Sequence, residues 1–277
     1  MNISVLILTR NEERNLPACL SAVRESDDIV VLDQGSTDQT VRIAHEAGAR
    51  VICHSAENER EQRTYSVRQI CFRHDWVFNP DADEIATPGL WDEMREATAD
   101  PSRVEVAYRI RGKLMFMGRW LRYSSLYPTW NTRLFKPSHL SFERTTNLVA
   151  RVDGPVGFLK SHYIHQTFNN GLTAWLEKHN RYSWHEAHES LDSLRTRAPR
   201  LRELLSKDPV IRRRAIKEWS FRLPCRPTLR FLYMYLVRRG FLDGLPGLHY
   251  CRLLAIYEYM IVLKMREIQM RDAGQPL

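Results

Sequence analysis

The chain has 277 residues, of which 43% are hydrophobic and seven are tryptophan, and this composition excludes a disordered chain. Its formal net charge of +8 favours anionic partners such as nucleotide phosphates, nucleic acid or an acidic membrane surface, without choosing among them. The five cysteines are scattered, so we expect reduced thiols rather than a disulfide framework. We expect neither an export signal nor a membrane-spanning segment, because no stretch reaches about 18–20 uncharged apolar residues.

The N-terminal part of the chain alternates short apolar runs with segments of helical spacing. This pattern predicts strands at residues 3–8, 29–32, 50–53 and 76–78, and helices at residues 12–25, 37–47 and 61–73. Such alternation is typical of an α/β fold with a doubly wound, mostly parallel sheet flanked by helices.

The pattern changes after Pro101. Strands are predicted at residues 104–110 and 132–135, and an irregular aromatic stretch lies between them. From Gly171 onward the chain has almost entirely helical spacing. We therefore predict a catalytic domain at residues 1–170 and a helical C-terminal region at residues 171–277.

Polar residues follow three of the predicted strands, at residues 9–12, 33–36 and 81–84. Doubly wound sheets bind ligands at the carboxyl ends of their strands, so we expect these segments to meet at one crevice. Asp81 and Asp83 lie two residues apart in a turn, where both carboxylates can face one ligand. Mg²⁺ and Mn²⁺ prefer oxygen ligands and commonly bridge carboxylates to substrate phosphates. The alternative is a solvated acidic turn, but the place of the pair at the end of the fourth strand favours a metal site.

Several spaced motifs resemble glycosyltransferase family 2, which has the GT-A fold. The resemblance is carried by residues 5–16, 30–40, 81–84, 127–135, 153–160, 178–183 and 240–244. Within the family, the chain is similar to the branch of lipopolysaccharide-core and related glucosyltransferases. The resemblance implies inverting transfer of a sugar from a nucleotide-diphosphate sugar, with a UDP-sugar as the default. It further implies a saccharide or lipid-linked acceptor in cell-envelope polysaccharide or lipopolysaccharide synthesis, and a requirement for Mn²⁺ or Mg²⁺.

The resemblance also implies roles for individual residues. The nucleotide-sugar pocket would be lined by Thr9, Asn11, Glu12, Asp33, Arg63, Asp81 and Arg133. Asp83 would hold the metal and serve catalysis, and His165 would complete the binding of metal or diphosphate. The alternative for His165 is a packed histidine beside Tyr163 and Phe168, and the alternative for Arg133 is an ordinary ion pair.

The chain departs from the family pattern at two places. Gln34 stands where many members have a second aspartate, so the identity of the base is open. Asn147-Leu148 stands where relatives often have a His-Glu pair whose glutamate is a candidate general base. Glu143 upstream is the weak substitute, and Asp153 is the nearest acid downstream. The missing pair supports one alternative, a catalytically altered, membrane-associated scaffold. A second alternative, a nucleotidyltransferase, normally has a glycine-rich basic phosphate loop after the first strand, unlike residues 9–12.

Basic residues far outnumber acidic ones between Arg195 and Arg239, and aromatic residues such as Trp219 and Phe231 are interleaved with them. Such a composition suits an amphipathic element in the headgroup layer of an anionic membrane. The alternatives are a solvated helix face and nucleic-acid binding, and no recognisable nucleic-acid-binding signature accompanies the charge. We therefore expect a cytoplasmic protein that is peripheral on the inner face of the plasma membrane and binds no nucleic acid.

Overall fold

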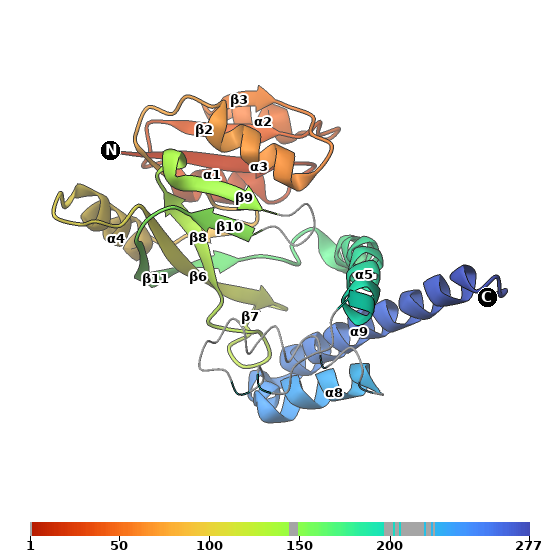
Figure 1. Ribbon diagram of the computed structural model, residues 1–277. Helices are drawn as coiled ribbons and strands as arrows, with labels where there is room; N and C mark the ends of the chain where they lie inside the picture. The colour runs from red at the N-terminus through yellow and green to blue at the C-terminus, as the bar shows by residue number, and fades with distance from the viewer. Residues whose placement is uncertain are drawn as a thin grey trace. The chain divides into compact units, whose positions relative to one another are not determined.

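The computed structural model describes residues 2–143, 149–196 and 225–277, together with residues 202, 205, 219 and 223. Contacts divide the chain into two compact units (Figure 1). The first unit comprises Met1–Arg122 and Leu126–Gly171, and the second comprises Tyr123–Ser125 and Leu172–Leu277. Among the described residues, no helix combines the length and the apolar character needed to cross a membrane.

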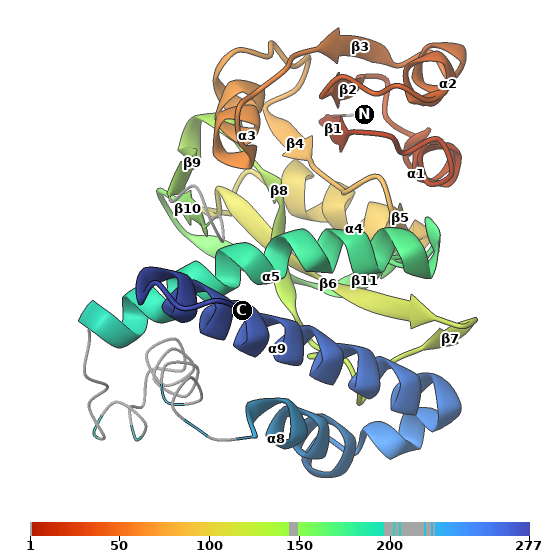
Figure 2. The same cartoon turned by 90° about the vertical axis from the view of Figure 1, so that its right-hand side faces the viewer.

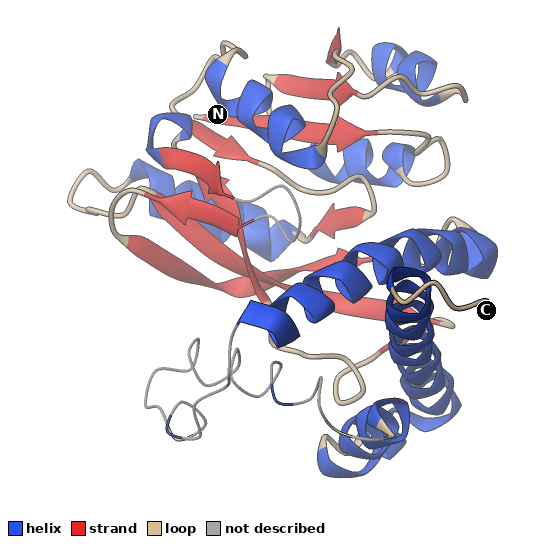
Figure 3. Ribbon diagram, turned by 45° about the vertical axis from the view of Figure 1, so that its right-hand side comes forward, coloured by secondary structure: helices blue, strands red, loops and turns tan. Residues whose placement is uncertain are grey.

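The first unit is built on a nine-stranded sheet, whose strands are red in Figure 3. Its order is β3-β2-β1-β4-β8-β6-β11-β5, with β7 paired to β6. Its strands are β1 (Ile3–Thr9), β2 (Ile29–Asp33), β3 (Arg50–Cys53), β4 (Trp76–Phe78), β5 (Glu84–Ala86), β6 (Ala107–Phe116), β7 (Arg119–Trp120), β8 (Trp130–Phe135) and β11 (Val156–His165). Strands β1 to β4 are parallel, as are β6 and β11, whereas β8 is antiparallel to both of its neighbours. A separate antiparallel pair consists of β9 (Leu140–Glu143) and β10 (Val149–Val152).

Helices cover both faces of the sheet. They are α1 (Leu16–Val23), α2 (Thr40–Glu46), α3 (Glu59–Arg68) and α4 (Pro88–Ala99), with a 3₁₀ turn, η1, at Pro137–His139. Side chains alternate across a strand, so Ile3, Val5 and Ile7 of β1 enter a core shared with α1 and α4. Leu6 enters the opposite core, which contains Val67 of α3 and packs against β9 and β10. The expected doubly wound, mostly parallel sheet is confirmed.

The predicted strands at residues 50–53 and 76–78 are confirmed with the same bounds. The helix predicted at residues 61–73 begins earlier and ends at Arg68, because Ile70 turns into the core beside Val67. The strand predicted at residues 104–110 lies later, at β6. The sequence analysis missed β5, α4 and β11 altogether.

The second unit is helical. It contains α5 (Gly171–Thr196, whose first residue belongs to the first unit), α8 (Arg226–Leu232), a π-helical turn η2 (Tyr233–Val237), a 3₁₀ turn η3 (Gly240–Asp243) and α9 (Gly244–Asp272). Helices α5 and α9 share a core that includes Leu191 and Ile261 (Figure 2). The buried carboxylate of Asp243 fixes the inserted segment, because it accepts hydrogen bonds from the backbone N–H groups of Tyr123 and Ser124, at 2.9 and 2.7 Å. The helical character expected of the C-terminal extension is confirmed for its described residues.

Candidate functional site

The carboxyl ends of β1, β2 and β4 meet, as the order of the sheet requires. Thr9 and Asp33 are paired in register, and the Thr9 hydroxyl donates a 2.9 Å hydrogen bond to Asp33 Oδ1. Asp81 forms an isolated parallel bridge with Leu8, one residue before Thr9. The three polar segments therefore lie together at the carboxyl edge of the parallel strands.

Asp33 organises the turn that follows β2. This carboxylate is buried, and it accepts hydrogen bonds from the backbone N–H of Ser36 at 2.8 Å and from the Ser36 hydroxyl at 2.5 Å. The neighbouring Gln34 donates through Nε2 to the carbonyl of Ala56, 3.2 Å away. Thr9 and Asp33 are thus almost inaccessible, and they support the loops after β1 and β2 from beneath.

The loops after β1 and β2 are joined by hydrogen bonds. Asn11, which has a φ of 55°, donates its N–H to the Ser36 hydroxyl at 2.8 Å and accepts the Thr37 N–H at 2.8 Å through Oδ1. The Glu12 N–H donates to the Thr40 hydroxyl at 2.8 Å. These loops form one preorganised wall, and the left-handed Asn11 is the position where the chain turns.

Glu12 is held in place by amides from two parts of the chain. Its Oε2 accepts hydrogen bonds from Asn15 Nδ2 at 2.6 Å and from Asn170 Nδ2 at 3.2 Å. Asn169 donates in turn to Asn15 Oδ1 at 2.8 Å. The sequence analysis missed these asparagines. No motif singles them out, because only the fold brings residues 169 and 170 beside the first loop.

Asp81 lies in a cluster of charges at the centre of the site. Both of its carboxylate oxygens accept hydrogen bonds from Arg133, and Arg63 Nη2 lies 3.6 Å from Oδ1. Arg133 also pairs at 2.5 Å with Glu84, whose side chain is 1% exposed. The ion pair considered for Arg133 is therefore present, and it lies within the predicted site. Glu84 belongs to the polar segment 81–84 expected at the site, but the sequence gives it no role of its own.

The charge cluster shifts the protonation equilibria of its members in opposite directions. Burial alone raises the pKa of the Asp81 carboxyl, but the guanidinium groups of Arg133 and Arg63 outweigh burial and hold that pKa below its usual range. Burial raises the pKa of Glu84 to about 7, since Asp81 opposes the effect of Arg133. Asp81 is therefore the charged partner, and Glu84 is the buried acid behind it.

Asp83 and His165 form the second half of the site. His165 is the last residue of β11 and pairs with Glu84 of β5, which places its ring beside the turn that carries Asp83. Its Nε2 lies 3.2 Å from Asp83 Oδ2, and the two side chains are 30% and 21% exposed. Burial lowers the pKa of His165, but the hydrogen bond and charge of Asp83 outweigh burial and raise it overall. His165 thus pairs with an acid, and its ring also lies beside Tyr163, with ring centres 6.4 Å apart, so both interpretations of this histidine have a contact in the structure.

These two residues fit a divalent cation that shares its coordination with a ligand. A carboxylate oxygen and an imidazole nitrogen lie close together and remain accessible, and Mg²⁺ sites often use few protein ligands together with phosphates and water. Within the described part of the chain, no three His, Cys, Asp or Glu residues form a complete metal cage.

The two candidate general bases lie at different places in the first unit. Glu143 ends β9, and the carbonyl of the preceding Phe142 accepts a 3.2 Å hydrogen bond from Arg60 in the first turn of α3. Arg63, one turn further along α3, reaches Asp81. Asp153 instead precedes β11 at the end opposite His165. Residues Asn147 and Leu148 lie outside the described part of the chain.

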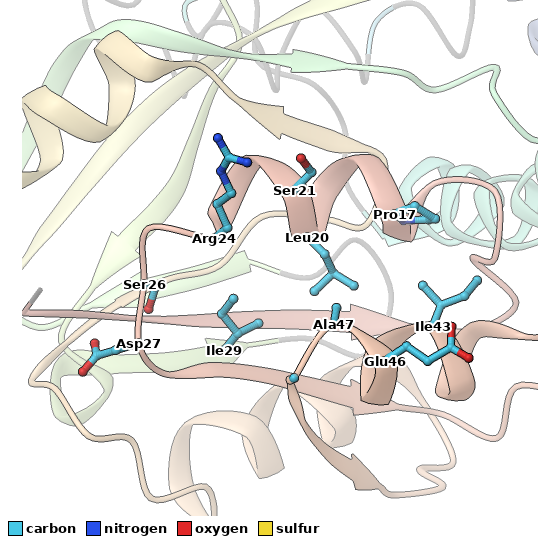
Figure 4. Close-up of a pocket in the computed structure, with 11 residues that line it drawn as sticks. Pro17, Leu20, Ser21, Arg24, Ser26, Asp27, Ile29, Ile43, Glu46 and Ala47 are labelled. Atoms are coloured by element: carbon cyan, nitrogen blue, oxygen red, sulfur yellow. The ribbon is translucent and has the colours of Figure 1, made fainter.

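A separate hollow lies between α1 and α2 (Figure 4). Its lining includes Pro17, Leu20, Arg24, Ile43 and Glu46. None of the predicted site residues lines this hollow, so it is distinct from the crevice.

Comparisons with known proteins identify a family and several relatives. The model of the family described as Glycosyl transferase family 2 matches residues 4–163. An uncharacterised glycosyltransferase of Rickettsia typhi is 28% identical over 98% of this chain and 88% of its own length. The lipopolysaccharide core biosynthesis glycosyltransferase LpsC of Rhizobium meliloti is 23% identical over 75% of this chain and 78% of that protein.

Among solved structures, glucosyl-3-phosphoglycerate synthase of Mycobacterium tuberculosis, in complex with Mn²⁺, UDP and glucosyl-3-phosphoglycerate, matches with a TM-score of 0.38 and 21% identity. The match covers 50% of this chain and 57% of that one, so this chain spans little more than half of the solved protein.

Proposed function

Because the chain belongs to glycosyltransferase family 2, whose GT-A sheet is the one described above, we propose a metal-dependent transfer of a sugar from a nucleotide-diphosphate donor. The observation that carries the proposal is the accessible Asp83–His165 pair beside the charge cluster of Asp81. Thr9, Asn11, Glu12 and Asp33 shape the nucleotide side of the crevice. UDP is the default nucleotide. The base has to be determined by experiment, because Gln34 replaces the second aspartate that many members of the family have at this position.

In this proposal Asp83 and His165 hold Mn²⁺ or Mg²⁺ against the donor. When bound, such a cation neutralises the negative charge of a departing diphosphate. Arg63 and Arg133 keep Asp81 charged and oriented, and Asp81 then accepts hydrogen bonds from the ribose or sugar. Arg133 is 9% exposed and already paired with two carboxylates, so it acts by positioning them rather than by gripping phosphate.

Inverting transfer forms one bond and breaks one. The acceptor hydroxyl oxygen bonds to the anomeric carbon, the bond from that carbon to the phosphate oxygen breaks, and the nucleoside diphosphate leaves. A base must take the hydroxyl proton. We assign this role to Glu143, because its backbone lies beside the N-terminal part of α3, which also carries Arg63. The acceptor in this proposal is a saccharide or lipid-linked saccharide of the cell envelope.

The proposal includes binding at an anionic membrane surface on the cytoplasmic side. Most of the basic stretch behind this expectation lies outside the described residues. The support comes from the second unit, where large apolar side chains are exposed in η2, η3 and the start of α9: Leu236 at 53%, Val237 at 70%, Phe241 at 46% and Leu245 at 68%. Arg239 lies between them in the sequence. Exposed apolar residues beside basic ones suit a headgroup layer.

Donor turnover tests the catalytic proposal. We expect Mn²⁺-dependent hydrolysis of one member of a nucleotide-sugar panel, and thermal stabilisation by the matching nucleoside diphosphate with Mn²⁺. Asp83→Asn should abolish both responses, whereas Asp75→Asn, which changes an exposed aspartate elsewhere, should abolish neither. A wild-type protein without any nucleotide response would contradict the proposal and favour a scaffold.

Vesicle sedimentation tests the membrane part separately. Vesicles rich in phosphatidylserine should recover the intact protein, and Val237→Asp with Leu245→Asp should reduce the recovery. Equal recovery of the variant and the wild type would exclude this surface from membrane binding.

A further inference from the structure

A row of positive charges runs along one face of β6. Arg109, Arg111 and Lys113 alternate with the buried Ile110, so the three cations share the face opposite to it. In the neighbouring strands, Trp130 of β8 pairs in register with Arg111, and Phe158 of β11 pairs with Arg109. We refer to Arg109, Arg111, Lys113, Trp130 and Phe158 as the cationic strip.

The strip interleaves charges with aromatic rings. The guanidinium carbon of Arg109 lies 5.8 Å from the centre of the Phe158 ring, and that of Arg111 lies 5.6 Å from the centre of the Trp130 ring. The two rings meet edge to face, with centres 5.1 Å apart. Lys113 continues the pattern, with Nζ 4.5 Å from the ring of Trp120. Such contacts hold long cationic side chains in fixed positions on the sheet.

Within the part of the chain that the structure describes, the positive charge of the strip has no acidic partner. Among the described side chains, no carboxylate lies within ion-pair distance of Arg109, Arg111 or Lys113, whereas Arg50 and Arg95 of the same unit both have acidic partners. Burial and the charges of Lys113 and Arg111 lower the pKa of His162. Phe158 is 56% exposed, an unusual state for a large ring on a sheet. The strip therefore presents both positive charge and an accessible aromatic surface.

The strip lies in the same sheet as the crevice. Lys113 pairs with Ile164, directly before His165, so the strip ends beside the strand terminus that carries the Asp83 partner. Ala107, on the same face of β6, packs in the core that contains Val67 of α3. The strip thus faces the side of the sheet from which Arg63 of α3 reaches Asp81.

We propose that the cationic strip binds the sugar acceptor, and that this acceptor is a negatively charged saccharide. Its sugar rings would lie on Phe158 and Trp130, and its phosphate or carboxylate groups would pair with Arg109 and Arg111. Planar guanidinium groups suit both kinds of anion, since they form bidentate hydrogen bonds. This inference rests on the proposed function, because it concerns the second substrate of the same site.

A lipid bilayer fits this face less well, because a membrane-binding surface needs several aliphatic side chains that can enter the headgroup layer. Proteins that bind single-stranded RNA combine aromatic and cationic contacts in a similar way, so the test includes an RNA oligonucleotide as a competing ligand.

Calorimetric titration with hexagalacturonate, a carboxylated saccharide, tests the inference, and neutral maltohexaose is the matched ligand. We expect the charged saccharide to bind at least about tenfold more tightly, since a charge-assisted hydrogen bond is worth about 1.5–3 kcal/mol. Arg109→Gln should weaken binding of hexagalacturonate about tenfold, and Phe158→Ala should weaken both saccharides. Arg42→Gln, which removes a charge from the exposed face of α2, should leave binding unchanged.

Three outcomes would overturn the inference. In the first the wild type fails to bind hexagalacturonate, and in the second Arg109→Gln binds hexagalacturonate as tightly as the wild type does. The third is that a single-stranded RNA oligonucleotide binds the wild type more tightly than the saccharide does, and that Arg109→Gln weakens the binding of this RNA. Thermal stabilisation by UDP with Mn²⁺ is measured on the same samples. Arg109→Gln should keep that response, so a failure of the acceptor site is distinguishable from a failure of the donor site.

Discussion

Replacement of Arg133 by methionine should destabilise the first unit strongly. Arg133 is 9% exposed and pairs with Asp81 and with Glu84, which is 1% exposed. Methionine has a similar length but no charge, so the change leaves two carboxylates without their main cation. Loss of one partner from a buried ion pair costs about 3–5 kcal/mol, because the remaining charge stays desolvated. That loss is a large fraction of the about 5–15 kcal/mol that stabilises a typical domain.

A double-mutant cycle isolates the interaction. In the double variant Arg133→Met with Glu84→Gln, a neutral amide replaces the buried acid. We expect the loss in its free energy of unfolding to be at least about 1 kcal/mol smaller than the sum of the losses in the two single variants. Arg42→Met is the control, because its exposed pair with Glu46 is worth about 0.3–0.5 kcal/mol. The assay is urea unfolding followed by tryptophan fluorescence. A loss below about 1 kcal/mol for Arg133→Met, or strictly additive changes, would refute the reasoning.

Three further predictions concern stability. The buried Asp28 accepts hydrogen bonds from the Arg73 N–H, the Ser4 hydroxyl and Arg50; burial raises its pKa, but these donors outweigh burial and lower it below the unfolded value. Its contribution is therefore complete above about pH 4 and is lost as the pH falls through the folded pKa. Asp28→Asn should cost about 1–3 kcal/mol at pH 7, and the difference from wild type should shrink in acid unfolding experiments; a difference independent of pH would contradict this. Asp243→Ala should lower the free energy of unfolding in urea by about 2–4 kcal/mol, because three hydrogen-bond donors on Tyr123 and Ser124 lose the buried carboxylate that accepts from them. An unchanged free energy of unfolding would contradict this. Gly247→Ala should lower the melting temperature, because the new Cβ would lie 2.3 Å from the carbonyl oxygen of Gly240. Gly89→Ala is the control and should not lower it, because its Cβ would lie 3.9 Å from the Ser161 hydroxyl oxygen. Equal melting temperatures of the two variants would contradict the close approach of η3 and α9.

The parallel half of the fold was predictable because its strands are continuous apolar runs. β1, β2 and β4 are buried on both faces, and such strands are visible in composition alone. β11 was missed because Lys160, Ser161 and His162 interrupt its apolar pattern, and its register shifts in the same region. Its identity as a strand comes from pairing with β6 and β5, which a local pattern does not contain. α4 was a true oversight, since Leu90, Trp91, Met94 and Ala97 have helical spacing.

Convergence of the site was predictable for the same topological reason. Loops after parallel strands meet at one edge, so the sequence pattern alone predicts that Thr9, Asp33 and Asp81 lie together. The charge balance was not predictable. Glu84 is buried because Arg133, 49 residues further along the chain, closes over it, and Glu12 is fixed by Asn170. Partners so distant in sequence leave no local pattern, and only the folded chain identifies them.

Electron paramagnetic resonance of Mn²⁺ tests the central claim most directly, because it reports the cation itself rather than turnover. With UDP present, the wild-type protein should reduce the signal of free Mn²⁺ below the level that UDP alone gives, since in the proposed site Asp83 and His165 would hold the ion together with the diphosphate. Asp83→Asn and His165→Gln should each leave the signal at the level of UDP without protein. Undiminished binding of Mn²⁺ by both variants would contradict the account.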